Sequence, residues 1–253
     1  MRYLLFALLA FFALGSITAQ QVLEVKYLQK RNTHAGEEDA EFFSNDEFAF
    51  LTTNGISSSY RYGQGGDGKQ VVSSGNNQIK VNYSDAEGYV FFTDGAKRQL
   101  ISRDLIKDQP FIIREDLPTF NWTIINEEIR EIGGYTCHKA TTTFRGRSYV
   151  AWFAPKIPIN AGPWKLAGLP GLILEATDRS GAVQFIFAGI KPLPASEDDG
   201  SWSRAPRKGI STSLGNFLDN RRRKDEEFFQ KIASYPGVTI TPSKKTSYFE
   251  TSL

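Results

Sequence analysis

Short segments in which apolar and polar residues alternate recur along the chain after its first twenty residues. This period of two is typical of β-strands with one buried face, because successive side chains point to opposite faces. Turn residues separate the segments throughout. The pattern predicts strands in the following stretches: VLEVKYLQ, DEFAFLTT, ISSSYRY, QIKVNYS, GYVFFTD, RQLISRD, PFIIRE, FNWTII, YTCHKATTTF, SYVAWFA, GLILEATD and AVQFIFAGIKPL.

Tight turns set the direction of these strands. Asn54-Gly55 lies between two predicted strands and is a strong hairpin signal, because both residue types tolerate a positive φ. Gly133-Gly134, Arg145-Gly146 and Arg179-Ser180-Gly181 occupy similar places further along the chain. Strands joined by such short turns pair antiparallel. The lack of alternating strands and helices argues against a doubly wound parallel sheet.

One long helix is expected near the C-terminus, over residues 211–234. The basic run Arg221–Lys224 in its middle is followed by Asp225–Glu227, so we interpret the run as a solvated face, with an anion-binding patch as the alternative. Many antiparallel strands and one late helix favour a mainly β fold. We expect a curved antiparallel meander sheet or half-barrel, since a sheet this long must twist and curl.

The first residues are typical of an export signal. Arg2 precedes an apolar stretch, and small residues then lead to Ala19. The apolar stretch is shorter than the roughly 20 residues of a membrane-spanning helix. We therefore expect residues 1–19 to be a signal peptide and residues 20–253 to form a single β-rich domain without a transmembrane segment. The expected location is the periplasm or the extracellular space.

Charge and cysteine content exclude some classes of protein. Without residues 1–19, which contain one arginine, the chain has 29 basic and 28 acidic residues. This balance gives no electrostatic drive toward nucleic acid, so no nucleic-acid partner is expected. Cys137 is the only cysteine, which rules out an intramolecular disulfide. We interpret Cys137 as a buried apolar filler, with a reactive or metal-binding thiol as the alternative.

Catalytic and cofactor motifs are weak in this chain. GQGGDGK at residues 63–69 matches two phosphate-binding patterns, but both need a helix directly after the glycines, and loop and strand formers follow instead. We expect a hairpin loop there. The two histidines are His34, in a polar loop, and His138, which follows Cys137 on a predicted strand where neighbouring side chains diverge. No catalytic residue, metal ligand or cofactor is assigned.

Three clusters of carboxylates are the remaining candidates for acid–base chemistry: Glu37–Asp39, Glu127-Glu128 and Asp198-Asp199. Each cluster lies among polar residues that are typical of turns. Nothing near them in the sequence would desolvate one carboxylate and raise its pKa. We therefore interpret all three clusters as solvated loops.

The stretch GPWKLAGLPGLILEATD at residues 162–178 combines loop formers with apolar residues. Its prolines and glycines exclude regular structure over residues 161–171, whereas its large apolar side chains require burial. Such a loop should lie across the concave face of the sheet or plug the mouth of the half-barrel. It is either a plug that completes the core or the wall of an apolar ligand cavity. The candidate ligand-binding residues are Trp152, Trp164, Leu166, Leu169, Pro170 and Leu172.

GLPGLI at Gly168–Ile173 is the name-giving motif of the GLPGLI family, and residues 110–195 resemble that family. The resemblance also includes FNWTI, IGGYTCHKA, YVAWFA and IPI. It implies an exported, periplasmic protein of the kind found mainly in Bacteroidetes, in a family without a settled biochemical activity. The expected curled sheet is similar in layout to periplasmic lipoprotein carriers of the LolA type, whose half-barrel shelters acyl chains.

These observations favour a non-enzymatic binding or carrier module that holds a hydrophobic ligand, such as a lipid or hydrophobic peptide, in the half-barrel. The alternative is a structural accessory protein of an envelope or outer-membrane transport assembly, with an outer-membrane protein as its partner. A third hypothesis, a hydrolase, requires a cleft that brings His138 together with a carboxylate and a serine.

Overall fold

The computed structural model describes residues 21–32, 44–66, 68–73, 79–236, 248–250 and 252. The expected signal peptide at residues 1–19 lies outside the described residues, as do His34 and Glu37–Asp39. Within the described part of the chain, no helix has the length and apolar character needed to cross a lipid bilayer.

The described residues form fourteen strands and one helix. Twelve strands make one large sheet, and β4 pairs with β5 in a separate two-stranded sheet. The elements are β1 (Leu23–Asn32), β2 (Ser44–Thr53), β3 (Ser57–Tyr62), β4 (Gly68–Ser73), β5 (Ile79–Ser84), β6 (Tyr89–Asp94), β7 (Gln99–Ile106), β8 (Gln109–Asp116), β9 (Thr123–Ile132), β10 (Tyr135–Phe144), β11 (Arg147–Ala154), β12 (Leu172–Asp178), β13 (Val183–Pro192), β14 (Ile210–Thr212) and α2 (Leu214–Ala233).

Two antiparallel meanders make up the large sheet. One contains β1, β2, β3, β6, β7 and β8, and the other contains β9 to β13. They meet where β13 pairs antiparallel with β1, so the first strand lies in the middle of the sheet. β14 adds a short parallel strand next to β8. The predicted mainly β fold with a curved antiparallel sheet and one helix is therefore confirmed.

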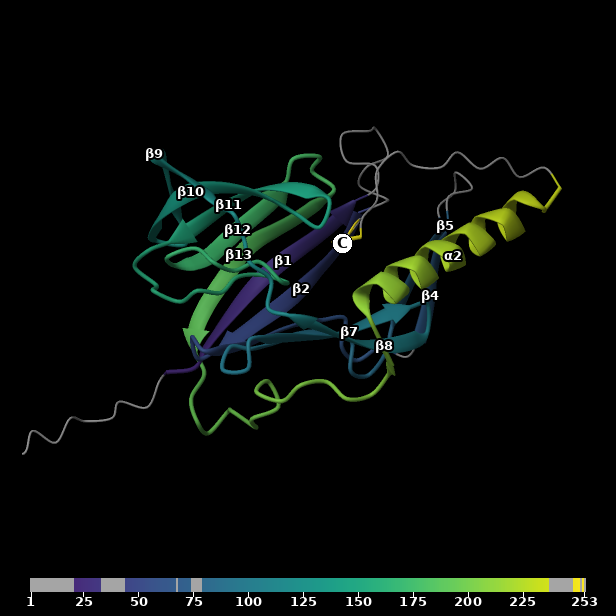
Figure 1. The fold of residues 1–253 in the computed structure, drawn as a ribbon, viewed down its shortest axis with the longest axis horizontal. Coiled ribbons are helices and arrows are strands. Elements are labelled where there is room, and N and C mark those ends of the chain that lie inside the picture. The colour runs from purple at the N-terminus through teal and green to yellow at the C-terminus, as the bar shows by residue number, and fades with distance from the viewer. Residues whose placement is uncertain are drawn as a thin grey trace, which may run out of the picture.

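The connection from β8 to β9 shows how strongly the sheet curves. These strands are ten strand-to-strand steps apart, yet only residues 117–122 join them. In a flat sheet the steps would cover roughly 48 Å at about 4.8 Å each, whereas the connection reaches at most about 25 Å when fully extended. Figure 1 shows the result: the β9–β13 wing and the β7–β8 wing lie on either side of β1 and β2, in an open half-barrel.

The predicted turns are confirmed by the backbone angles. Gly133-Gly134 has φ values of 58° and 83°, and Arg145-Gly146 has values of 52° and 77°. Two successive positive φ angles are typical of two-residue hairpin turns whose twist matches that of the strands. At the β2–β3 turn, Gly55 has a φ of 84° and the side chain of Asn54 accepts a hydrogen bond from the N–H of Ser57 at 2.9 Å.

The glycine-rich segment at residues 63–69 leads into a strand. It is a loop as far as Gly66, as predicted, but Gly68 already begins β4. β4 then pairs with β5 in an antiparallel hairpin. Because both phosphate-binding patterns depend on a helix at this point, neither motif has the element it requires.

Helix α2 covers the β7–β8 wing of the sheet (Figure 1). It begins later than residue 211, because residues 210–212 pair with β8 as β14. Ser213 caps it, with its Oγ accepting a hydrogen bond from the N–H of Asn216 at 3.2 Å. Its buried face packs on the sheet in a small apolar cluster formed by Ile106, Phe111, Ile113, Leu214 and Phe217.

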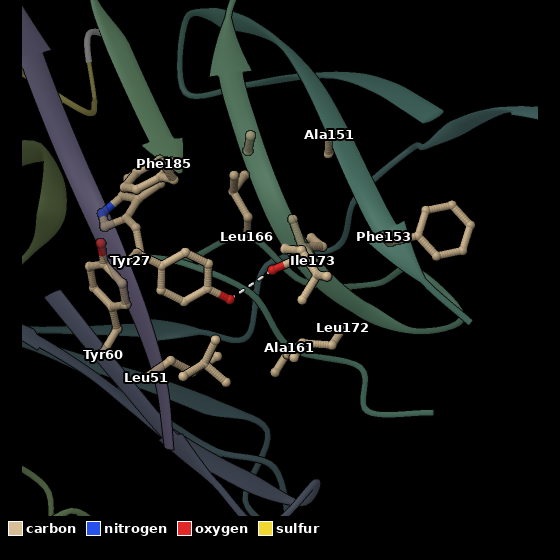
Figure 2. Close-up of a cluster of buried hydrophobic side chains, with 14 of the residues drawn as sticks. Tyr27, Leu51, Tyr60, Ala151, Phe153, Ala161, Leu166, Leu172, Ile173 and Phe185 are labelled. Carbon is tan, nitrogen blue, oxygen red and sulfur yellow. Dashed lines mark hydrogen bonds between the residues drawn. The ribbon is translucent and has the colours of Figure 1, made fainter. Parts of the chain in front are cut away.

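The main core lies between the two wings of the half-barrel. Figure 2 shows the side chains of Tyr27, Tyr60 and Phe185 packed together near the β11–β12 region. The Tyr27 hydroxyl donates to the carbonyl of Ile173 at 2.7 Å, which ties the central strand β1 to the start of β12. A buried hydroxyl without such a partner would cost about 1–3 kcal/mol.

Candidate functional site

The loop of residues 155–171, which joins β11 to β12, folds inward as predicted. Trp164, Leu166 and Leu169 are at most 4 % exposed, and Leu172 and Ile173 at the start of β12 are fully buried. All five belong to the main hydrophobic cluster, which contains side chains from both meanders. The β11–β12 loop is therefore part of the core that fills the half-barrel.

Trp164 is at the centre of this packing. Its ring centroid lies 5.3 Å from that of Phe249, 5.6 Å from that of Phe144 and 6.4 Å from those of Phe91 and Tyr149. Its φ of 56° lies in the left-handed region, which bulky residues rarely adopt. The packed rings hold this strained conformation in place.

The backbone of the buried loop is hydrogen bonded, as burial requires. Trp122 Nε1 donates to the carbonyl of Ala167 at 2.7 Å. The N–H of Leu172 donates to the carbonyl of Ile157 at 2.9 Å, which fixes the two ends of the loop against each other. The loop is thus a rigid wall on which other groups can pack.

Four of the six candidate ligand-binding residues are buried members of the main hydrophobic cluster, and two are not. Pro170 is exposed to solvent. Trp152 on β11 is half-buried, and the guanidinium of Arg130 lies 4.4 Å from its ring centroid. The structure therefore brings Trp164, Leu166, Leu169 and Leu172 together, but not the complete predicted set.

The tripeptide Tyr248–Glu250, close to the C-terminus, packs against the β11–β12 loop. Phe249 is 7 % exposed, and its ring centroid lies 5.3 Å from that of Trp164 and 5.4 Å from that of Phe185. It also makes an edge contact with Tyr62 at 6.1 Å. Because Tyr62 is on β3 and Phe185 is on β13, the tripeptide contacts both meanders inside the half-barrel (Figure 1).

Lys165 forms the charged centre of this contact. Its side chain is completely buried, and its Nζ pairs with the carboxylates of Glu115 on β8 and Glu250 in the tripeptide. Glu115 also pairs with Arg145 in the β10–β11 turn. These pairs connect the two wings of the half-barrel. One carboxylate oxygen of Glu250, Oε2, is buried without a hydrogen-bond partner.

Two buried arginines hold the backbone of the tripeptide. Arg147 on β11 donates from Nε and Nη2 to the carbonyl of Tyr248, at 2.9 and 2.6 Å, and pairs with the buried Asp178 at 2.6 Å. Arg221 on α2 donates to the carbonyl of Glu250 at 2.6 Å. Its guanidinium also lies 3.9 Å from the centroid of the Tyr248 ring.

We call the side chains that contact the tripeptide the tripeptide site. It comprises Arg31, Tyr62, Arg147, Trp164, Lys165, Phe185, Arg221 and Asp225, the last of which accepts a hydrogen bond from the Tyr248 hydroxyl. Three of its cations act through hydrogen bonds or ion pairs, and Arg31 lies 5.6 Å from the Phe249 ring. The site combines an aromatic slot with buried positive charge.

Burial raises the pKa of two carboxylates at the edge of the site. Burial raises the pKa of Asp104, and the nearby Arg221 lowers it only in part. Burial likewise raises the pKa of Asp225, against the effect of the hydrogen bond that it accepts from the Tyr248 hydroxyl. For both carboxylates the cost of burying the charged form is thus only partly offset by nearby groups.

Cys137 and His138 do not form a reactive pair. Cys137 is fully buried, its Sγ lies 3.4 Å from the carbonyl of Tyr135, and burial raises the pKa of its thiol to about 11. These features agree with a filler. His138 packs on Phe153, and its Nδ1 has no hydrogen-bond partner. Among the described residues, no three His, Cys, Asp or Glu side chains are grouped as a metal site.

The two carboxylate clusters that the structure describes differ in their setting. Asp198 and Asp199 lie in a loop, as predicted, and Asp199 accepts a hydrogen bond from the N–H of Ser201 at 2.8 Å. Glu127 and Glu128 are exposed, but they lie on β9 rather than in a turn. The prediction of a loop is therefore wrong for Glu127 and Glu128. The exposed edge strand β9 is polar along most of its length, so its composition resembles that of a turn.

The basic run on α2 agrees with the prediction in three of its four residues. Arg222 pairs with Asp219, and Arg223 and Lys224 pair with Glu227 on the exposed side of the helix. The prediction is wrong for Arg221, which is 9 % exposed and faces the half-barrel. The helical repeat places Arg221 one turn after Phe217, on the buried face.

Two hollows on the described surface lie outside the tripeptide site. One, of about 540 Å³, is lined by Asn121, Thr123, Thr141, Thr142, Thr143, Ser148, Tyr149, Val150 and Arg179. The other, of about 480 Å³, is lined by Arg130, Glu131, Ile132, Gly133, Glu175, Phe187 and Ala188. Neither hollow is lined by His138 or by any of the six predicted ligand-binding residues.

Sequence reasoning did not identify Lys165, Arg147 or the tripeptide as parts of a site. Lys165 is the one charged residue within GPWKLAGLPGLIL, and a lysine in a segment that must be buried signals a buried ion pair. The aromatic pair Tyr248-Phe249 in a polar tail is a weaker signal. Nothing in the sequence indicates that these groups meet.

Comparisons with known proteins agree with this picture without assigning an activity. Residues 144–175 match the family model described as "Protein of unknown function (Porph_ging)", and this segment contains β11 and the β11–β12 loop. No curated protein sequence matches the chain significantly.

Two solved structures of PNGF-II, in space groups P21 and C2, are similar in fold. Each has a TM-score of 0.53, with 13 % and 14 % sequence identity over 81 % of this chain. The chain spans about a third of the length of PNGF-II: the match covers 34 % of the PNGF-II chain in the first structure and 33 % in the second. At such low identity the similarity concerns the fold alone.

Proposed function

We propose that this protein is an exported, non-enzymatic binding module that holds a hydrophobic segment of a partner inside its half-barrel. The family match gives a family of unknown function. The more specific assignment to the GLPGLI family rests on the motif at Gly168–Ile173, and the periplasmic or extracellular location rests on the export signal at residues 1–19.

The observation that carries the proposal is the tripeptide inside the half-barrel. The interior accepts a short peptide whose backbone is held by Arg147 and Arg221 and whose aromatic ring enters a slot beside Trp164. Fixed donors and a rigid aromatic wall are the usual components of a peptide-binding site. The same packed rings leave less support for a lipid as the ligand.

A specific feature also supports the alternative role as an accessory protein of an envelope or outer-membrane transport assembly. β9 is an edge strand of ten residues, and Ile124 and Ile129 on it are 39 % and 57 % exposed. An exposed edge can add a strand from a partner. Glu127 and Glu128 on the same strand are charges of the kind that protect edges from pairing, so we rank this role second.

The test uses the purified protein, organic-solvent extraction and a panel of unstructured peptides, half apolar and half polar. We expect no stoichiometric lipid in the extract. At millimolar concentration, apolar peptides should slow hydrogen exchange in β1, β3 and β13, whereas polar peptides of equal length should not.

Two results would overturn the proposal. Stoichiometric acyl chains in the extract would make the protein a lipid carrier. Protection confined to β9 would support the accessory role, with the partner bound at the sheet edge.

A further inference from the structure

Three of the four cations around the tripeptide recognise different parts of a peptide. Arg147 and Arg221 donate to main-chain carbonyls, which every peptide offers. Their acceptors belong to Tyr248 and Glu250, two residues apart. Lys165 instead pairs with a side-chain carboxylate. Two contacts are therefore general for a peptide backbone, and one is specific for an acidic residue.

The aromatic slot adds a second element of specificity. Phe249 lies between the rings of Trp164, Phe185 and Tyr62, with Arg31 at 5.6 Å from its centroid. Aromatic pairs at such distances are stabilising beyond the burial of their area. The slot is thus suited to a flat ring directly before the acidic residue.

The charges in the site require an occupant of this kind. Lys165 is fully buried and has Glu115 and Glu250 as its two carboxylate partners. A buried charge that loses a partner is strongly destabilised. The buried Oε2 of Glu250 has no hydrogen-bond partner, so the tripeptide leaves part of the acceptor capacity of its own carboxylate unused.

We propose that the tripeptide Tyr248–Glu250 occupies the site of the partner segment, and that this segment is a short peptide with an aromatic residue followed by an acidic one. The inference rests on the proposed function and specifies its ligand. Because the tripeptide is part of the same chain, its effective concentration at the site is high and it competes with the partner. The free protein is therefore self-occupied, and a partner binds by displacing the tripeptide.

The experiment measures binding of a fluorescent heptapeptide with the sequence of residues 247–253, SYFETSL, by anisotropy. Three full-length proteins are compared: the wild type, the tail variant Phe249→Ala/Glu250→Gln, and the control variant Phe229→Ala/Glu226→Gln. The control makes the same two changes at exposed positions of α2. A single cooperative melting transition shows that each variant is folded.

We expect the heptapeptide to bind the tail variant at least ~10-fold more tightly than it binds the wild type or the control, because the internal competitor is weakened. Heptapeptides with Phe→Ala or Glu→Gln at the corresponding positions should bind the tail variant at least ~10-fold more weakly. If the double variant does not fold, Glu250→Gln alone serves as the tail variant, since it keeps Phe249 in the core.

Equal affinity for the wild type and the tail variant would overturn the inference, as would equal binding of the Glu and Gln peptides. If other apolar peptides still protect the interior, the proposed function survives and only its ligand changes. If no peptide of either set binds any of the proteins, both proposals are wrong.

Discussion

Lys165 is a buried charge that pairs with two buried carboxylates, so we expect it to contribute to the stability of the protein. Replacing it with methionine keeps the length of the side chain but leaves the carboxylates of Glu115 and Glu250 buried without their shared cation. Breaking a buried ion pair in this way costs about 3–5 kcal/mol. We expect Lys165→Met to lower the free energy of unfolding by that amount, measured by urea denaturation at pH 7.

Lys156→Met is the matched control, because Lys156 lies in the same loop but is exposed. It should change the free energy of unfolding by no more than about 0.5 kcal/mol, as surface substitutions usually do. A similar small effect for both variants would mean that the charges around Lys165 contribute little to stability, and the tripeptide would then be held mainly by Phe249.

The end of the β11–β12 loop at Gly171 lies directly against the end of β11 at Ala154. A Cβ added at Gly171 would lie 2.4 Å from the carbonyl oxygen of Ala154, which is fixed backbone. Gly171→Ala should therefore destabilise the protein by roughly 3 kcal/mol, since overpacking against backbone adds about 1–3 kcal/mol to the strain of the substitution. Thermal or urea unfolding measures this loss.

Gly134→Ala is the control that isolates the backbone strain of a glycine-to-alanine change from the crowding of the added Cβ. Gly134 also has a positive φ, of 83°, but an added Cβ there would meet no atom within 4 Å. Gly134→Ala should therefore lower the free energy of unfolding by the backbone strain alone, about 1–2 kcal/mol. If Gly171→Ala were no worse than Gly134→Ala, the loop would be able to move away from β11, contrary to its role as a rigid wall.

Local patterns predicted the strands and turns well, because each depends on neighbouring residues. Gly133-Gly134 specifies its own turn, and the alternation in YTCHKATTTF matches β10 from Tyr135 to Phe144. The return of β13 to β1 could not be predicted in the same way, because the alternation of a strand carries no information about a distant partner. Burial of Trp164 followed from its apolar context, whereas the partners of Lys165 did not.

The half-barrel is held together by groups that are distant in the sequence. β1 pairs with β2 and with β13, and so joins the two meanders. On the open side, Glu115 on β8 pairs with Arg145 at the β10–β11 turn, and Lys165 joins Glu115 to the tripeptide. The first strand and the tripeptide thus contribute side chains to the same interior.

This arrangement predicts how the protein opens. Because β1 is hydrogen bonded to β2 on one side and to β13 on the other, its amides exchange with solvent only when the middle of the sheet opens, which is close to complete unfolding. β9 is bonded on one side only, to β10. Native-state hydrogen exchange followed by mass spectrometry should find the amides of β1 among the slowest, about 1,000-fold slower than those on the outer edge of β9. Exchange of β1 at the rate of β9 would instead show that the sheet opens between β1 and β13, so that each meander unfolds as a separate unit and the site between them lacks a fixed shape.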